Sequence, residues 1–233
     1  MDVEYIDIAG QMLQMIGWVF LPFALLPIFV LGLAQSKFLE TFQFTIIEII
    51  DTVNLTIGEW VKWLLVLMVV SIAFATIALS IFGQSWTKLD ESSIYFHALI
   101  ILLGSAATLL AGKHVRVDIF YTKMGPKAKA LVDLLGFYAL LIPFCLVIIW
   151  NAQGTVHLAW LSLEGSAESD GIRGVFLLKT CISVFALLLL LQGMAIAGRA
   201  ALLLTNKASP VLPDYIDPFF GLKSDAKPVE PKQ

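Results

Sequence analysis

Long, uninterrupted runs of apolar residues dominate the pattern of this chain. A helix needs about 20 apolar residues to cross the hydrocarbon of a bilayer. Five runs approach this length, and the few charged residues within them stand near their ends: 16–34, 60–83, 94–111, 130–150 and 174–204. The pattern predicts an all-α integral membrane protein with four core transmembrane helices and an extra N-terminal span.

The first run, 16–34, differs from the others because it contains Pro22 and Pro27. Each proline removes a helix hydrogen bond, although membrane helices tolerate this where neighbouring groups satisfy the backbone. We predict that this run crosses the membrane. A re-entrant or interfacial segment is the alternative.

Between the first two runs, segment 37–58 mixes aromatic and β-branched residues with polar ones. The polar positions recur at helical spacing at Thr41, Thr45, Glu48 and Thr52. This predicts an amphipathic helix that lies in the cytoplasmic interface or against a partner subunit. A plain connector that extends the second span is the alternative.

The predicted organisation therefore has three parts. Residues 1–59 form an N-terminal extension, residues 60–204 a four-helix core, and residues 205–233 a tail. The tail carries mixed charges and five prolines (Pro210, Pro213, Pro218, Pro228 and Pro231), a composition typical of partly disordered segments.

Basic residues predict the orientation of the chain in the membrane. Five of them cluster between the third and fourth runs, at Lys113, Arg116, Lys123, Lys127 and Lys129. With this block in the cytoplasm, only Lys88, Arg173 and Lys179 of the fifteen basic residues lie outside, which leaves twelve inside. Because cytoplasmic loops are rich in Lys and Arg, we predict an outside N-terminus and a cytoplasmic C-terminus.

Composition supports the membrane assignment and argues against several other classes. Hydrophobic residues make up 59% of the chain and charged residues only 14%, whereas soluble domains have about 25% charged residues. The net charge of −3 gives no indication of nucleic-acid binding. The chain lacks GxGxxG, Walker, HExxH and CxxC motifs, so we predict neither an enzyme nor an ATP-driven pump, and no cofactor or metal.

Ionisable residues at membrane depth usually mark a path for ions or substrates. Here the charges within the core spans lie near span ends, where long side chains reach the interface: Lys62, Asp133, Lys179 and Arg199. We predict that they are end-of-helix anchors, with Lys127 or Lys129 available to pair with Asp133. The chain is therefore predicted to lack a transport site of its own.

Two other functions stay open. His97 and His157 are predicted near the outer face on adjacent helices, as the axial ligands of a membrane cytochrome would be. The other possibility is a self-sufficient small transporter or channel.

One short sequence within this basic block is informative beyond its charge. His114-Val-Arg116-Val-Asp118 follows the Leu-Leu-Gly-Ser-Ala-Ala of residues 102–107 and precedes the basic turn. In this context it resembles the small permease subunit (DctQ-like) of TRAP (tripartite ATP-independent periplasmic) transporters. Further matches in order are Asp90-Glu91, Asp133 to Gly136, Pro143, Trp160, Glu164 to Glu168, Lys179 and 191–193. The resemblance covers residues 60–204, and the N-terminal extension resembles the longer subgroup.

The resemblance implies a multi-pass subunit of the bacterial inner membrane. It would be a scaffold and stabiliser for a large permease subunit, in ion-coupled uptake of a small carboxylate delivered by a periplasmic solute-binding protein. Its partners would be these two proteins and membrane lipids.

Two sets of residues carry the expected roles. His114, Arg116 and Asp118 would order the cytoplasmic turn, which we call the cytoplasmic elbow. Glu91, Glu164 and Glu168 would contact the binding protein, with ordinary solvated loop acids as the alternative.

Overall fold

The computed structural model describes residues 25, 27–28, 37–112, 121, 123–207 and 210. Its elements are α3 (Lys37–Phe82), α4 (Thr87–Leu110), α6 (Pro126–Gly136), the π-helix η1 (Phe137–Leu141), α7 (Ile142–Leu161) and α8 (Val175–Leu204). Four stretches are long and apolar enough to cross a membrane: α3, α4, the run Pro126–Leu161, and α8. The all-α class and the four core helices are thus confirmed, while the predicted crossing at 16–34 falls almost entirely outside the described residues.

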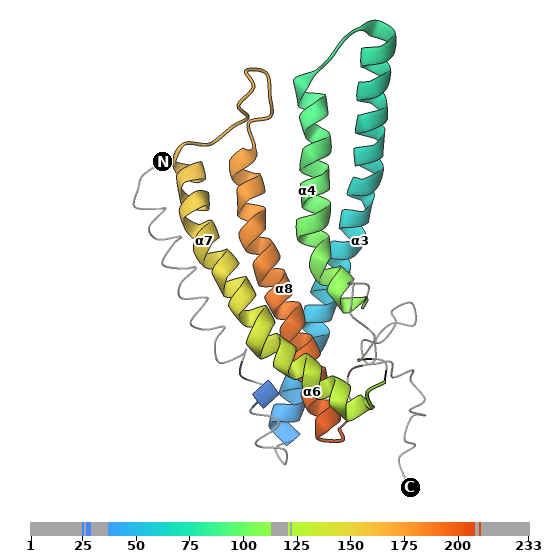
Figure 1. The fold of residues 1–233 in the computed structure, drawn as a ribbon, viewed down its shortest axis with the longest axis vertical. Helices are drawn as coiled ribbons and strands as arrows, with labels where there is room; N and C mark the ends of the chain where they lie inside the picture. The colour runs from blue at the N-terminus through green and yellow to red at the C-terminus, as the bar shows by residue number, and fades with distance from the viewer. Residues whose placement is uncertain are drawn as a thin grey trace.

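The four long helices run alternately up and down (Figure 1). α3 rises along the molecule, α4 returns beside it, the α6–η1–α7 run rises on the other side, and α8 descends between α4 and α7. All four converge at the lower end, whereas the α3–α4 and α7–α8 pairs diverge toward the upper end. The molecule is therefore two helical hairpins that are joined most closely at one end.

α3 is a single helix of 46 residues. The sequence predicted an amphipathic helix over 37–58 and a separate span from residue 60, but the structure has no break between them. Segment 37–58 is thus helical and continuous with the helix of the second span. At 1.5 Å per residue the helix is about 69 Å long.

The third span passes through Pro143 without a break in the helical run. η1 occupies residues 137–141, and Pro143 stands in the first turn of α7. A proline inside an α-helix lacks one N–H donor, and its ring clashes with the carbonyl four residues earlier. The wider π turn directly before it adjusts the backbone at this point.

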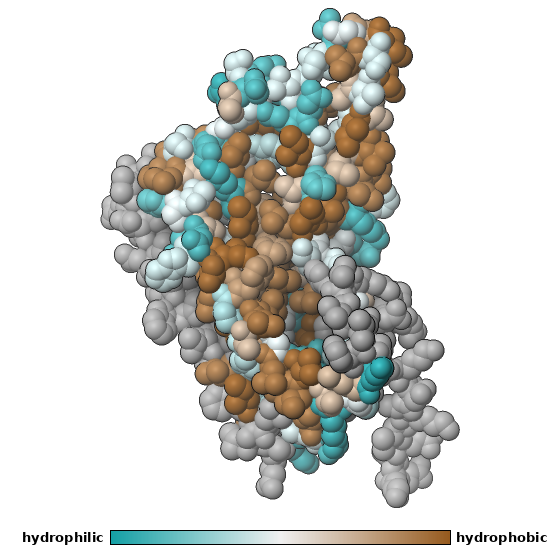
Figure 2. Space-filling model, in the orientation of Figure 1, coloured by the Kyte–Doolittle hydropathy of each residue, from teal (hydrophilic) through white to brown (hydrophobic). Residues whose placement is uncertain are grey.

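The core lies at the convergent lower end. The C-terminal half of α8 is buried on nearly all sides, from Leu188 to Leu202. It is rich in small residues, Gly193, Ala195, Ala197, Gly198, Ala200 and Ala201, which allow neighbouring backbones to approach closely. Elsewhere the helices present apolar side chains outward (Figure 2), as lipid-facing helices do.

Gly193 gives a test of this close packing. A Cβ at Gly193 would collide with the side chain of Leu141 and stand 2.9 Å from Cδ2 of Phe137. We expect Gly193→Ala to destabilise the protein by about 1–3 kcal/mol, because overpacking outweighs the better helix propensity of alanine. Thermal unfolding in detergent measures the effect.

Gly154, inside α7, is the matched control because a Cβ there has no heavy atom within 4 Å. Gly154→Ala is expected to leave the melting temperature unchanged or to raise it. Equal behaviour of the two variants would contradict the observed packing of α8 on η1.

Candidate functional site: a polar cluster between α3 and α8

The face of α3 that packs on α8 is half polar. Its buried residues recur at helical spacing: Gln43, Ile47, Ile50, Asp51 and Asn54. α8 contributes Gln192 and Arg199, which are seven residues apart and therefore lie on one face. These residues bring two charges and three amides into the interior, which we call the polar cluster: Gln43, Asp51, Asn54, Gln192 and Arg199.

An ion pair stands at the centre of the polar cluster. Nη2 of Arg199 contacts Oδ2 of Asp51, and Nη1 of Arg199 lies 3.4 Å from Oδ1. The side chains of Arg199 and Asp51 are only 6% and 10% exposed. Two parallel N–H···O contacts between a guanidinium and a carboxylate fix both the distance and the orientation of the two groups.

The amides extend this contact along both helices. Nε2 of Gln192 donates to Oδ1 of Asp51 at 3.1 Å, and Nδ2 of Asn54 donates to Oε1 of Gln192 at 2.7 Å. One further link is made by Nε2 of Gln43, which donates to the carbonyl of Gly198 at 2.7 Å. α3 is therefore tied to α8 at several successive levels.

The polar cluster specifies how the two helices align. A buried ion pair pays a large desolvation cost, so it stabilises little compared with a well-packed apolar pair. Removing one partner is different, because it leaves a buried charge uncompensated. The pairing of Asp51 with Arg199 therefore disfavours any other register between α3 and α8.

The prediction that Arg199 is an end-of-helix anchor is wrong. α8 is surrounded by protein at this position, so the side chain cannot extend to the interface and pairs with Asp51 instead. Sequence reasoning also missed Gln43, Asp51, Asn54 and Gln192. For the three residues of α3, the signal was the repeat of polar residues on the face of 37–58 opposite the threonines, a face that must pack on another helix.

The other predicted anchors have local partners. Lys62 pairs with Glu59 on the exposed surface of α3. Lys179 pairs with Glu164, with Nζ–Oε distances of 2.6 and 2.7 Å. Asp133 accepts a hydrogen bond from the hydroxyl of Tyr121 at 2.7 Å.

Acidic residues organise the loop 162–174 at the upper end. Glu91 of α4 accepts hydrogen bonds from the hydroxyl of Ser166 and, at 2.6 Å, from the backbone N–H of Ile172. Glu164 holds the start of the loop to α8 through Lys179. Glu168 is exposed. Two of the three predicted contact residues therefore have an internal structural role.

The remaining predicted residues are not brought together. His97 and His157 are exposed on α4 and α7, and α8 lies between these helices (Figure 1). They are not placed as two ligands of one haem. Among the described residues no group of three or more His, Cys, Asp or Glu side chains could hold a metal ion. His114, Arg116 and Asp118 lie outside the described residues.

A double-mutant cycle tests the ion pair. We expect Asp51→Leu and Arg199→Met each to lower the free energy of unfolding by about 3–5 kcal/mol, because each leaves a buried charge unpaired. The double variant should recover most of this loss. Asp170→Asn, which removes the exposed pair with Lys88, should change stability by less than about 1 kcal/mol. Additive losses in the double variant would contradict a direct pair.

Comparison with known families matches the core of this structure. The family model "Tripartite ATP-independent periplasmic transporters, DctQ component" matches residues 64–203, which is more than half of the chain. Comparison with curated proteins and with solved structures found no match. The matched part runs from the upper half of α3 to the end of α8, in agreement with the resemblance in the motif residues. The chain belongs to the DctQ family, a family of transporter components, and is a small, multi-pass membrane subunit of a TRAP transporter.

Proposed function

We propose that this subunit is a static scaffold for the large permease. The transporter would take up a small carboxylate, coupled to an ion and delivered by a periplasmic binding protein. The observation that carries the scaffold role is the Asp51–Arg199 pair, because it uses the two buried charges of the described core to join α3 to α8.

A transport site has different requirements. Groups that bind an ion or a carboxylate must be able to exchange partners, and they commonly stand at broken helices near the midplane. In the described part of the chain the buried charged residues are Asp51 and Arg199, and they neutralise each other. This supports a division of labour in which the large permease binds the solute and the ion.

The upper end offers a surface for the binding protein. The contacts of Glu91 and Glu164 hold loop 162–174 against α4 and α8, and Glu168 and Asp170 are exposed on it. We propose that this ordered acidic loop contributes to docking, with Glu168 available to a partner and Glu91 acting through the loop.

The proposal places the lower end in the cytoplasm. Lys37, Lys123, Lys127, Lys129 and Lys207 belong to segments at this end, whereas loop 162–174 is mainly acidic. We expect a fluorescent protein fused after Gln233 to fluoresce and an alkaline phosphatase fused there to be inactive. The opposite pair of results would overturn the orientation.

The cytoplasmic elbow is proposed to support assembly rather than selectivity. Arg116→Ala and Asp118→Ala are expected to lower both the amount of large permease that co-purifies and the uptake rate severalfold. Solute preference should be unchanged. Lys123→Ala, in the exposed part of the same turn, is the control.

Two outcomes would count against the scaffold role or against the proposed function as a whole. A change in solute preference in either elbow variant would count against the scaffold role. Full uptake by the large permease and the binding protein in the absence of this subunit would contradict the proposed function as a whole.

A further inference from the structure

Two charged residues and two tryptophans are exposed together halfway along α3. Glu59 and Lys62 form an ion pair in which their side chains are 59% and 56% exposed. Trp60 and Trp63 lie beside this pair and are 74% and 62% exposed. We call these four residues the α3 patch. What can cover the α3 patch depends on its depth in the membrane.

Loop 162–174 limits how far up the hydrocarbon layer can reach. Acidic residues are exposed on this loop, and ionised side chains at lipid depth are costly. Glu91 of α4 holds the loop, and the hydroxyl of the next residue, Ser92, donates to that of Ser71 in α3 at 3.2 Å. The loop is therefore level with Ser71 to within about one helical turn. A hydrocarbon layer over residues 62–82 would place these acids at mid-membrane, so the upper edge lies at or below Ser71.

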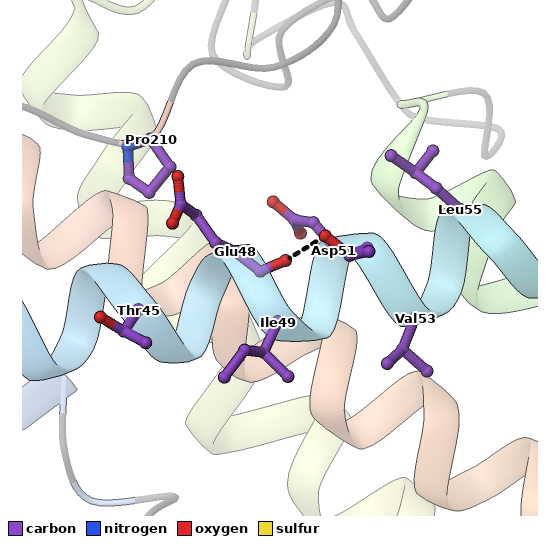
Figure 3. A pocket seen from close by; sticks show the side chains of 8 residues that line it. Thr45, Glu48, Ile49, Asp51, Val53, Leu55 and Pro210 are labelled. Carbon is purple, nitrogen blue, oxygen red and sulfur yellow. Dashed lines mark hydrogen bonds between the residues drawn. The ribbon is translucent and has the colours of Figure 1, made fainter.

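An exposed carboxylate marks the lower edge of the layer. Glu48 is exposed on α3 and points toward Pro210 (Figure 3). From Glu48 to Ser71 the helix rises about 35 Å, and the hydrocarbon of a bilayer is about 30 Å thick. Glu59 is 11 residues from Glu48 and 12 from Ser71. The α3 patch therefore lies near the middle of the layer.

The other spans place the α3 patch at the same depth. Cγ1 of Val61 lies 3.5 Å from the position of a Cβ on Gly104, in the apolar part of α4. Asn54, slightly below the patch, bonds with Gln192 near the middle of α8. The other spans carry no Asp, Glu, Lys or Arg over long central stretches, which are 92–110, 134–163 and 180–198. Among the described residues between the two edges, the exposed charges are therefore those of the α3 patch.

Lipid is a poor cover for such a surface. Ionisable residues within the membrane almost always face other protein or a water-filled cavity, and lipid-facing tryptophans concentrate at the membrane interfaces. Thr56, one turn before the patch, is exposed, and its hydroxyl donates to the carbonyl of Thr52 at 2.7 Å. Short side chains that are satisfied in this way let another helix approach. The depth and composition of the α3 patch thus favour contact with protein.

The α3 patch has more hydrogen-bond donors than acceptors. Each indole has one N–H donor, and the ammonium of Lys62 has three, of which one is directed to Glu59. Within the described part of the chain the indoles of Trp60 and Trp63 have no hydrogen-bond partner. A second copy of this chain would bring the same excess of donors to the contact. A different chain that is rich in acceptors fits better.

We propose that the α3 patch binds a membrane helix of the large permease that places hydroxyl or amide oxygens opposite Lys62 and the two tryptophans. The inference rests on the proposed function and adds the contact surface. It gives α3 two roles on different faces, because one face is joined to α8 by the polar cluster and the other is joined to the partner subunit.

Site-specific photocross-linking in the co-expressed complex tests which molecule covers the α3 patch. Trp63 is replaced with the photoreactive residue p-benzoylphenylalanine, and the control has the same replacement at Trp150, which is 81% exposed on α7. Illumination is expected to join the subunit to the large permease from position 63 and not from position 150. A product with a second copy, no protein product, or equal yields from both positions would overturn the inference.

Alanine substitution measures how much the contact contributes. Trp63→Ala is expected to lower the amount of large permease that co-purifies with the tagged subunit about tenfold, as the loss of one anchor residue does. Trp150→Ala should leave this amount unchanged. An equal melting temperature of the isolated Trp63→Ala subunit shows that a loss of binding is not a loss of folding.

The outcomes distinguish this inference from the proposed function. Failure of the unmodified subunit to retain the large permease would count against the proposed function itself. Retention by the unmodified chain and equally by Trp63→Ala would overturn the inference alone.

Discussion

The ion pair between Asp51 and Arg199 is the contact on which the rest of this subunit depends. It joins α3, the first membrane helix of the described chain, to α8, the last one, across 148 residues of sequence. Because both side chains are buried, neither helix can slide or rotate without leaving a charge in an apolar interior. The lower halves of α3 and α8 therefore form one unit, and the two hairpins are held together at this end.

The two ends of the molecule are held in different ways. At the lower end, small residues of α8 admit the neighbouring helices closely, and the polar cluster selects one alignment among those that tight packing alone would permit. At the upper end the hairpins diverge (Figure 1), and the contacts of Glu91 with loop 162–174 bridge them. This arrangement gives a stiff base and an ordered loop at the upper end, as expected of the proposed static scaffold.

Much of the fold could be predicted from the sequence, because hydrophobic length is a local property. The last span was predicted as 174–204 and is observed as Val175–Leu204. Polar pairing is not local, and for this reason the role of Arg199 was predicted wrongly. Its position five residues before the end of an apolar run suggested an interface anchor, whereas its actual environment depends on what packs around α8. Segment 37–58 shows the same contrast between local and tertiary features. Its helical spacing was visible in the sequence, but its continuity with the next span and the partner of its polar face were visible only in the structure.

The central claim is that α3 and α8 do not move relative to one another during transport. The most direct measurement is uptake by the complete transporter with these helices cross-linked through Ile47→Cys and Gly198→Cys, with Cys145 and Cys181 replaced by alanine. Cγ1 of Ile47 lies 3.3 Å from the position of a Cβ on Gly198, so a disulfide is within reach. The account predicts the same uptake rate in the oxidised and the reduced protein. Loss of uptake on oxidation, with recovery on reduction, would contradict it.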